Sequence, residues 1–74
     1  MKRIAVVLEP VQGGFSVYAP DLPGCVSFGE SHAKALDNMR EALEGHLASM
    51  REHGEVMPEF DTSNVAVIEL DAAR

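Results

Sequence analysis

Hydrophobic and polar residues alternate along this chain with a period that changes near residue 30. Over the first 29 residues the period is two, which is typical of β-strands, and it predicts strands over residues 2–9, 15–19 and 25–29. The first strand has apolar residues on both faces, as expected for a strand inside a sheet. Pro10 is expected to end it, because proline cannot donate a hydrogen bond to a neighbouring strand.

From residue 32 to residue 53 the period becomes that of an α-helix. Its apolar stripe comprises Leu36, Met39, Leu43, Leu47 and Met50. Ser31 can cap the start of the helix, Gly54 can end it in the left-handed conformation, and Pro58 prevents its resumption. About 22 residues at roughly 1.5 Å each exceed the length of the strands, so the helix is predicted to overhang the sheet. Residues 55–64 are predicted to form a polar connection, residues 65–70 a final apolar strand and residues 71–74 a loose tail.

The element order is therefore β-β-β-α-β, which places the chain in the α+β class. An apolar last strand fits best beside the apolar first strand, reached by a right-handed crossover. The predicted sheet is four-stranded and mixed, with strand order 3-2-1-4 and the one helix on one face. The other face is expected to stay open beside an unpaired fourth strand, which favours self-association. Ala5, together with the self-association candidates, is expected on that open face; the candidates are Val7, Tyr18, Val65 and Val67.

The segment between the second and third strands carries the chemistry of a tight turn. Pro23 fixes φ for the second position of a turn, and Gly24 tolerates the positive φ that a type II turn requires next. Beside them, Asp21 and Leu22 are expected to be exposed and to contact a basic partner. Pro23 belongs to the same candidate contact, as does Glu30 at the other end of the third strand. The alternative is that Pro23 and Gly24 serve only to form the hairpin.

Composition and charge narrow the range of functions. The chain has 74 residues, enough for one domain with a marginal core, and nearly half of them are hydrophobic, which argues against disorder. Twelve acidic against six basic residues give a net charge of −6, which disfavours binding to nucleic acid and favours a basic protein partner. The single Cys25 cannot form an internal disulfide, so a cytoplasmic location is expected. No apolar run approaches a membrane span.

Four pieces of sequence, taken in order, carry a resemblance that spans about residues 4 to 70. They are Y-A-P-D-L-P-G-C, F-G-E-S, a helical A-L-x-N-x-x-E-A-L and G-E-x-x-P. In these pieces the chain is similar to the HicB-like antitoxin family, with the difference that Lys34 stands where the family usually has a glutamate. The resemblance implies a partial ribonuclease H-like fold. It also implies the antitoxin half of a toxin–antitoxin pair, which binds a small basic RNA-cleaving toxin of the HicA type and masks its active site.

Antitoxins of this kind usually carry a C-terminal DNA-binding segment as well. Residues 1–74 are expected to form a single HicB-like domain without such a segment, so no direct binding to nucleic acid is expected. Two alternatives stay open: an oligomeric interaction module that has no toxin, and a metal-dependent nuclease. A homodimer or a higher homo-oligomer is expected in either binding role.

The nuclease alternative depends on carboxylates, which are Glu9, Asp21, Asp37, Glu41 and Glu44. Two-metal cleavage needs several of them to converge, and the centre of the first strand, where a ribonuclease H-like nuclease would carry one, has only Ala5, Val6 and Val7. The acids of the helix are therefore interpreted as a solvated face.

No catalytic residue, metal site or cofactor is predicted. His46 and His53 lie two helical turns apart, too far to share a metal ion. Cys25 is interpreted as a small buried hydrophobic residue, since no histidine lies near it in sequence.

Overall fold

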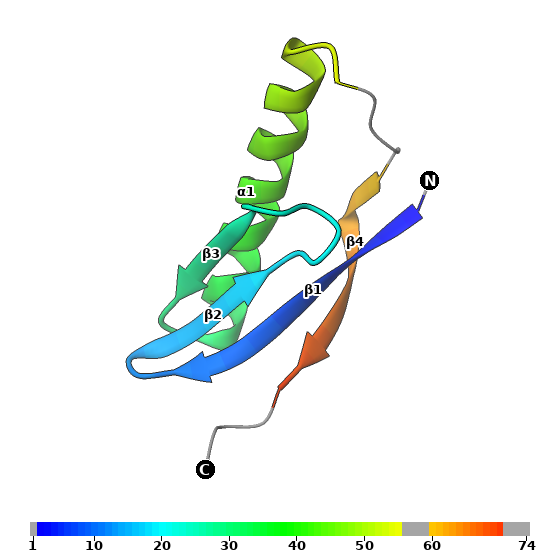
Figure 1. Ribbon diagram of the computed structural model, residues 1–74. Helices are drawn as coiled ribbons and strands as arrows, with labels where there is room; N and C mark the ends of the chain where they lie inside the picture. The colour runs from blue at the N-terminus through cyan, green and yellow to red at the C-terminus, as the bar shows by residue number, and fades with distance from the viewer. Residues whose placement is uncertain (1, 56–59, 71–74) are drawn as a thin grey trace.

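The computed structural model describes residues 2–55 and 60–70, and its elements follow the predicted order β-β-β-α-β (Figure 1). The elements are β1 (Lys2–Val11), β2 (Gly14–Tyr18), β3 (Val26–Gly29), α1 (His32–Glu52) and β4 (Phe60–Glu69). The predicted α+β class is thus confirmed. The predictions for Pro58 and for the tail over 71–74 fall outside the described residues.

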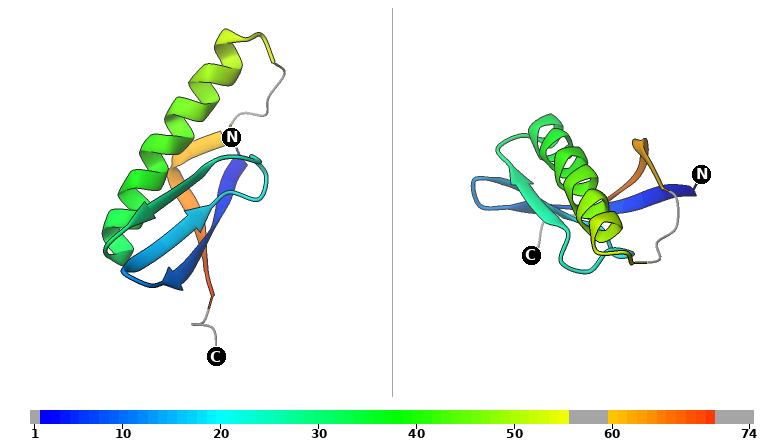
Figure 2. Two further views of the ribbon diagram at one scale, coloured as in Figure 1. Left: turned by 60° about the vertical axis from the view of Figure 1, so that its left-hand side comes forward. Right: turned by 90° about the horizontal axis from the view of Figure 1, so that it is seen from above.

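The four strands form one mixed sheet in the order β3-β2-β1-β4, as predicted. Strands β1, β2 and β3 pair as an antiparallel meander, and β4 pairs with β1 in parallel. The helix α1 lies along one face of this sheet and leaves the other uncovered (Figure 2). The likeness to ribonuclease H folds stays a prediction.

The helix begins and ends where its capping residues predict. The Ser31 hydroxyl accepts a hydrogen bond from the Lys34 N–H at 3.1 Å, and this satisfies one free donor of the first turn. At the other end Gly54 has a φ of 71°, the left-handed conformation that glycine adopts without strain. The last turns of α1 project beyond the strands, so the predicted overhang is confirmed (Figure 1).

A single glycine lets α1 start directly against the end of β3. A Cβ atom on Gly29 would overlap the backbone of Lys34 and Ala35 in the first helical turn. Because backbone atoms cannot swing aside, any side chain here would have to move the whole helix. Gly29 therefore sets how closely the helix and the sheet approach each other.

The core fills the space between α1 and the sheet. Its buried residues are Ile4, Val6, Leu8, Val17, Ala19, Leu22, Cys25, Ala35, Met39, Leu43 and Leu47. In β1 they occupy even positions and in β2 odd positions, so the odd positions of β1 and the even positions of β2 face the open side. The helix contacts β3 and β2 more extensively than β4.

The prediction that Pro10 ends the first strand is wrong, because β1 continues to Val11. The Leu70 N–H donates to Leu8 O at 2.9 Å, so even-numbered residues of β1 turn their backbone groups toward β4. Since β4 ends at Glu69, opposite Leu8, Pro10 lies past the end of that ladder. Its missing N–H group therefore removes no hydrogen bond from it.

The prediction that a polar connection runs to residue 64 is also wrong, because β4 already begins at Phe60. Phe60 pairs with Lys2, and the register shifts before Ala66 pairs with Ala5. The Arg3 guanidinium donates to two carbonyls of the irregular stretch, Asn64 O and Val65 O, both at 3.3 Å. These tertiary contacts outweigh the turn preference of the local sequence Asp-Thr-Ser-Asn.

Candidate partner-binding site

The connection between β2 and β3 consists of two successive tight turns. The Leu22 N–H donates to Ala19 O at 3.1 Å, and the Cys25 N–H donates to Leu22 O at 3.0 Å. Gly24 follows Pro23 with a φ of 88°, which is the geometry predicted for a type II turn. The turn therefore has a fixed shape that presents its side chains in defined directions.

Neighbouring residues of this turn point in opposite directions. Asp21 and Pro23 are exposed, but Leu22 is only 4% exposed and belongs to the core. The expectation that Leu22 is exposed is therefore wrong. Burying a leucine side chain gains about 1.5–3 kcal/mol, which draws the middle of the turn inward. Leu22 anchors the turn from beneath, while Asp21 and Pro23 are accessible to a partner.

The edge of β3 is partly protected by the helix. Cys25 O accepts from the Ala19 N–H at 3.2 Å and Ser27 lies opposite Val17, so odd residues of this strand turn their backbone groups toward β2. The groups of Val26 and Phe28 accordingly face outward. The side-chain amide of Asn38 in α1 donates to Phe28 O at 2.8 Å and so occupies one acceptor of the free edge.

A shallow groove of about 320 Å³ lies between β3 and α1 and is lined by Ser27, Asn38, Glu41 and Ala42. We call it the β3–α1 groove. The exposed Asp21 precedes β3 and the exposed Glu30 follows it, so the two candidate contact residues lie at opposite ends of the strand that forms one wall.

The sequence predicted the acids near this groove but not the groove itself. Ser27 and Asn38 lie eleven residues apart in the chain, and only the packing of α1 beside β3 brings them together. The available signal was weak: Ser27 is a small polar residue at a strand position that faces the helix.

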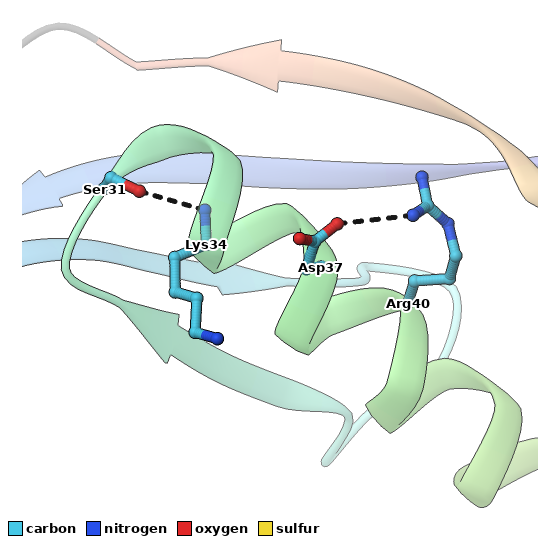
Figure 3. A network of polar contacts seen from close by, with 4 residues as sticks. All are labelled: Ser31, Lys34, Asp37 and Arg40. Atoms are coloured by element: carbon cyan, nitrogen blue, oxygen red, sulfur yellow. Dashed lines mark hydrogen bonds and ion pairs between the residues drawn. The ribbon is translucent and has the colours of Figure 1, made fainter.

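The outer face of α1 carries charged side chains whose contacts are long and exposed to solvent (Figure 3). Asp37 and Arg40, one turn apart, approach to 3.5 Å, and both side chains are exposed. An ion pair of this kind contributes about 0–1 kcal/mol. On the flank of the helix nearer β4, Glu44 accepts from the Thr62 hydroxyl at 3.5 Å. These contacts agree with the interpretation of the outer helical face as solvated.

The uncovered side of the sheet carries a row of apolar side chains that crosses all four strands. Tyr18 pairs with both Val26 and Val7, and Val7 pairs with Ile68, so these four residues share one face. Val26 is 63% exposed, Ile68 49% and Tyr18 38%. We call this side the open sheet face; Val7 and Tyr18 lie on it as predicted, although Val7 is buried within its row.

The placement of Val65 and Val67 on that face was wrong. Val67 pairs with Val6, which faces α1, and Val65 packs against the core on the same side. After the register shift, the parallel pairing brings the even residues of β4 from Ala66 onward to the open side, including Ile68. Both faces of this strand are apolar, so the sequence pattern alone did not distinguish them.

The carboxylates considered for nuclease chemistry lie on three parts of the molecule. Glu9 lies on the open sheet face, Asp21 lies in the turn, and Asp37, Glu41 and Glu44 lie on α1. Within residues 2–55 and 60–70, no three histidine, cysteine or acidic side chains are grouped to hold a metal ion.

Two of the three histidines have polar partners, and the cysteine is buried. His53 lies with Nδ1 2.7 Å from Ser49 O, and His32 lies with Nε2 3.1 Å from Glu69 Oε1. Burial raises the pKa of the Cys25 thiol, which keeps it neutral and makes it a poor nucleophile. The described part of the chain contains no helix that is long and apolar enough to cross a membrane.

Comparison with known proteins gives a family for this chain. Residues 4–73 match the model of the "HicB_like antitoxin of bacterial toxin-antitoxin system". A UPF0150 protein of Thermoplasma acidophilum is 30% identical over 67 residues, which cover 90% of this chain and 97% of that protein. A UPF0150 protein of Helicobacter pylori is 40% identical over 47 residues, 64% of this chain and 65% of that protein.

A longer relative shares only part of its length with this chain. An uncharacterized 14.9 kDa protein of Haemophilus phage HP1 is 38% identical over 53 residues, which cover 72% of this chain but 40% of the phage protein. No solved structure matches the chain significantly. The family match covers nearly all of the residues that build the sheet, the turn and the helix. By this match the chain belongs to the HicB-like antitoxin family of bacterial toxin–antitoxin systems.

Proposed function

We propose that this chain neutralises a small basic RNA-cleaving toxin of the HicA type by binding it along the β3–α1 groove and masking its active site. The observation that carries this proposal is the arrangement of acids around the groove. Glu41 lies in its wall, and Asp21 and Glu30 lie at the two ends of β3. A basic toxin would meet one acid in the groove and one beyond each end of β3, with Lys34 as a base on the same flank of α1 (Figure 3).

The proposed mechanism is competition with RNA for the same toxin surface. An RNA-cleaving protein binds phosphates through lysine and arginine side chains, and carboxylates can occupy those positions. The net charge of −6 would also accelerate the encounter with a basic partner. The rigid turn keeps Asp21 and Pro23 in place, so little conformational entropy is lost on binding.

We infer that the chain acts by binding and not by catalysis. Among the described residues no three carboxylates, histidines or cysteines are grouped to hold a metal ion, and the single thiol is buried and neutral. No cofactor enters the proposed mechanism. The lone reduced Cys25 fits a protein that works in the cytoplasm, where its toxin would cleave RNA. We also propose that the chain self-associates, since the open sheet face exposes apolar side chains.

The test is co-expression of this chain with the short basic protein encoded beside its gene, reading out growth, co-purification and RNA cleavage by the purified toxin. Rescue of growth and a stable complex are expected. Glu41→Lys and Asp21→Lys are each expected to weaken binding to the toxin about 10-fold, because each places a like charge against a basic surface.

The matched control is Glu44→Lys, which makes the same charge change in the same helix on the flank nearer β4. It should leave binding within about 2-fold. Equal losses for Glu41→Lys and Glu44→Lys would mean that net charge, and not the groove, attracts the toxin. Absence of any complex with a toxic neighbour would overturn the proposed function.

A further inference from the structure

The open sheet face exposes apolar side chains from all four strands, and no helix or strand of the described residues covers it. Beyond the row through Val7, it includes Phe28 on β3, 47% exposed, and Leu70 just after β4, 42% exposed. Two of these side chains are aromatic, and an aromatic residue buries about 150–250 Å² when fully covered. Monomeric proteins rarely expose contiguous apolar patches of more than a few hundred Å².

The charges of this face distinguish it from the rest of the molecule. Among its described positions the charged ones are Arg3, Glu9 and Asp61, which is one base against two acids. The other acids of the described chain lie mostly in the turn and along α1. A basic toxin therefore has little to gain on the open sheet face, while a second copy of this acidic chain meets little repulsion there.

We propose that two copies of this chain pack their open sheet faces together, with the two β1 strands antiparallel. This inference rests on the self-association through the open sheet face proposed above and adds the arrangement of the two copies. Two packed sheets lie about 10 Å apart with strand directions within about 30°. The apolar row of one copy then covers the apolar row of the other, and each α1 remains on the outside with its groove accessible.

The charges along β1 set the orientation. On the open side, β1 runs from Arg3 through Ala5 and Val7 to Glu9, with Asp61 paired beside Arg3. An antiparallel arrangement brings Glu9 of each copy toward Arg3 of the other. A parallel arrangement would bring Glu9 against Glu9 and Arg3 against Arg3, which is unfavourable in an interface that excludes water.

The experiment measures the mass of the purified chain by light scattering and sedimentation over about 1 μM to 1 mM. The wild-type chain is expected to be a dimer. Ile68→Asp is expected to raise the dimer dissociation constant at least about 10-fold. The adjacent Val67→Asp is the matched control, since Val67 faces the helix side of the same strand and is 37% exposed.

Val26→Lys is the second variant, because Val26 is 63% exposed on an edge strand and its replacement is expected to leave the monomer folded. Circular dichroism confirms folding for each variant. Loss of the dimer in Val67→Asp but not in Ile68→Asp and Val26→Lys would overturn the proposed surface and indicate pairing through the β4 edge. A monomer at every concentration would instead overturn self-association itself, leaving the toxin proposal to its own test.

The orientation has an independent test by charge exchange. Arg3→Glu alone and Glu9→Arg alone are each expected to weaken the homodimer, whereas the double variant Arg3→Glu/Glu9→Arg is expected to restore it. In the antiparallel arrangement the double variant again joins opposite charges at both ends of β1, whereas a parallel arrangement would still bring like charges together. Because Arg3 also donates to Asn64 O and Val65 O, circular dichroism checks that each variant folds. A double variant that stays as weak as the single variants would overturn the antiparallel orientation.

Discussion

The β3–α1 groove and the open sheet face lie on opposite sides of the same sheet and differ in almost every physical property. The groove is polar and has one acid, Glu41, in its wall and one acid beyond each end of β3. The open sheet face is apolar across all four strands and nearly neutral. Ser27 and Phe28, neighbours in β3, belong one to each surface, because successive residues of a strand point to opposite faces.

This difference shows how a domain of 74 residues can offer two interfaces that each select a different partner. Charge complementarity attracts a basic partner at long range to the groove, and salt weakens it. Burial of apolar area acts only at contact and depends little on salt. Toxin binding is therefore expected to weaken as salt rises, while dimerisation is expected to persist.

The largest expected effect comes from Gly29→Ala, at the junction that holds the groove together. The added methyl group overlaps the backbone of Ala35, so the first turn of α1 must move away from β3. We expect the free energy of unfolding to fall by about 3 kcal/mol, measured by urea denaturation. The open sheet face, built by strand pairing alone, is not touched directly. A loss below about 1 kcal/mol would mean that the helix adjusts without strain.

The next largest effect separates the buried part of the turn from its exposed part. Leu22→Ala leaves a cavity in the core and is expected to lower the free energy of unfolding by about 2–4 kcal/mol. Asp21→Ala next to it is expected to change stability by less than about 0.5 kcal/mol while weakening the toxin complex. Thermal unfolding and toxin titration of both variants check this. Equal destabilisation would contradict the division of the turn into an anchor and a contact.

A smaller effect is expected from Asn38→Ala, which removes the hydrogen bond from α1 to Phe28 O. One such bond contributes about 1 kcal/mol, and the freed carbonyl leaves the β3 edge open to another strand. We therefore expect slightly lower stability together with stronger association at high concentration. Asp37→Ala is the control, since its exposed ion pair with Arg40 contributes less. An Asn38→Ala variant that stays as soluble as the control would contradict the protective role of the amide.

The fold could be predicted because each level of the sequence agreed with the next. The period of two, the turn at Pro23 and Gly24, the cap at Ser31 and the helical stripe all specify elements that the structure contains. The strand order followed from the apolar character of the first and last strands. Because local preferences and the global arrangement agree, the fold of such a chain can be predicted from its sequence.

The site could be predicted only in part, because the wrong predictions concern positions that tertiary pairing determines. Val65 and Val67 were placed on the wrong face. Both faces of β4 are apolar, and only its parallel register with β1 decides which face the helix covers. Leu22 was expected outside because its neighbours are turn residues, and only the core beneath it explains its burial. Asn38 joins the groove through contact with a strand ten residues earlier, which no local pattern encodes.

The smallest predicted effect concerns Gly45, which lies one turn after Ala42 on the groove flank of α1. Glycine inside a helix is less favourable than alanine by about 0.8–1 kcal/mol, and a Cβ atom added here would meet nothing within 4 Å. Gly45→Ala is therefore expected to stabilise the free chain by up to about 1 kcal/mol and to leave the dimer unchanged.

A glycine that lowers stability at a position where alanine fits suggests a requirement in the complex, namely close approach of the toxin backbone. We accordingly expect Gly45→Ala to weaken toxin binding about 3-fold, measured by titration calorimetry. Ala48→Gly on the outer face is the reciprocal control. It is expected to lower stability by a similar amount and to leave toxin binding unchanged. A Gly45→Ala variant that binds the toxin as tightly as the wild type would limit the contact surface to the part of the groove before Gly45.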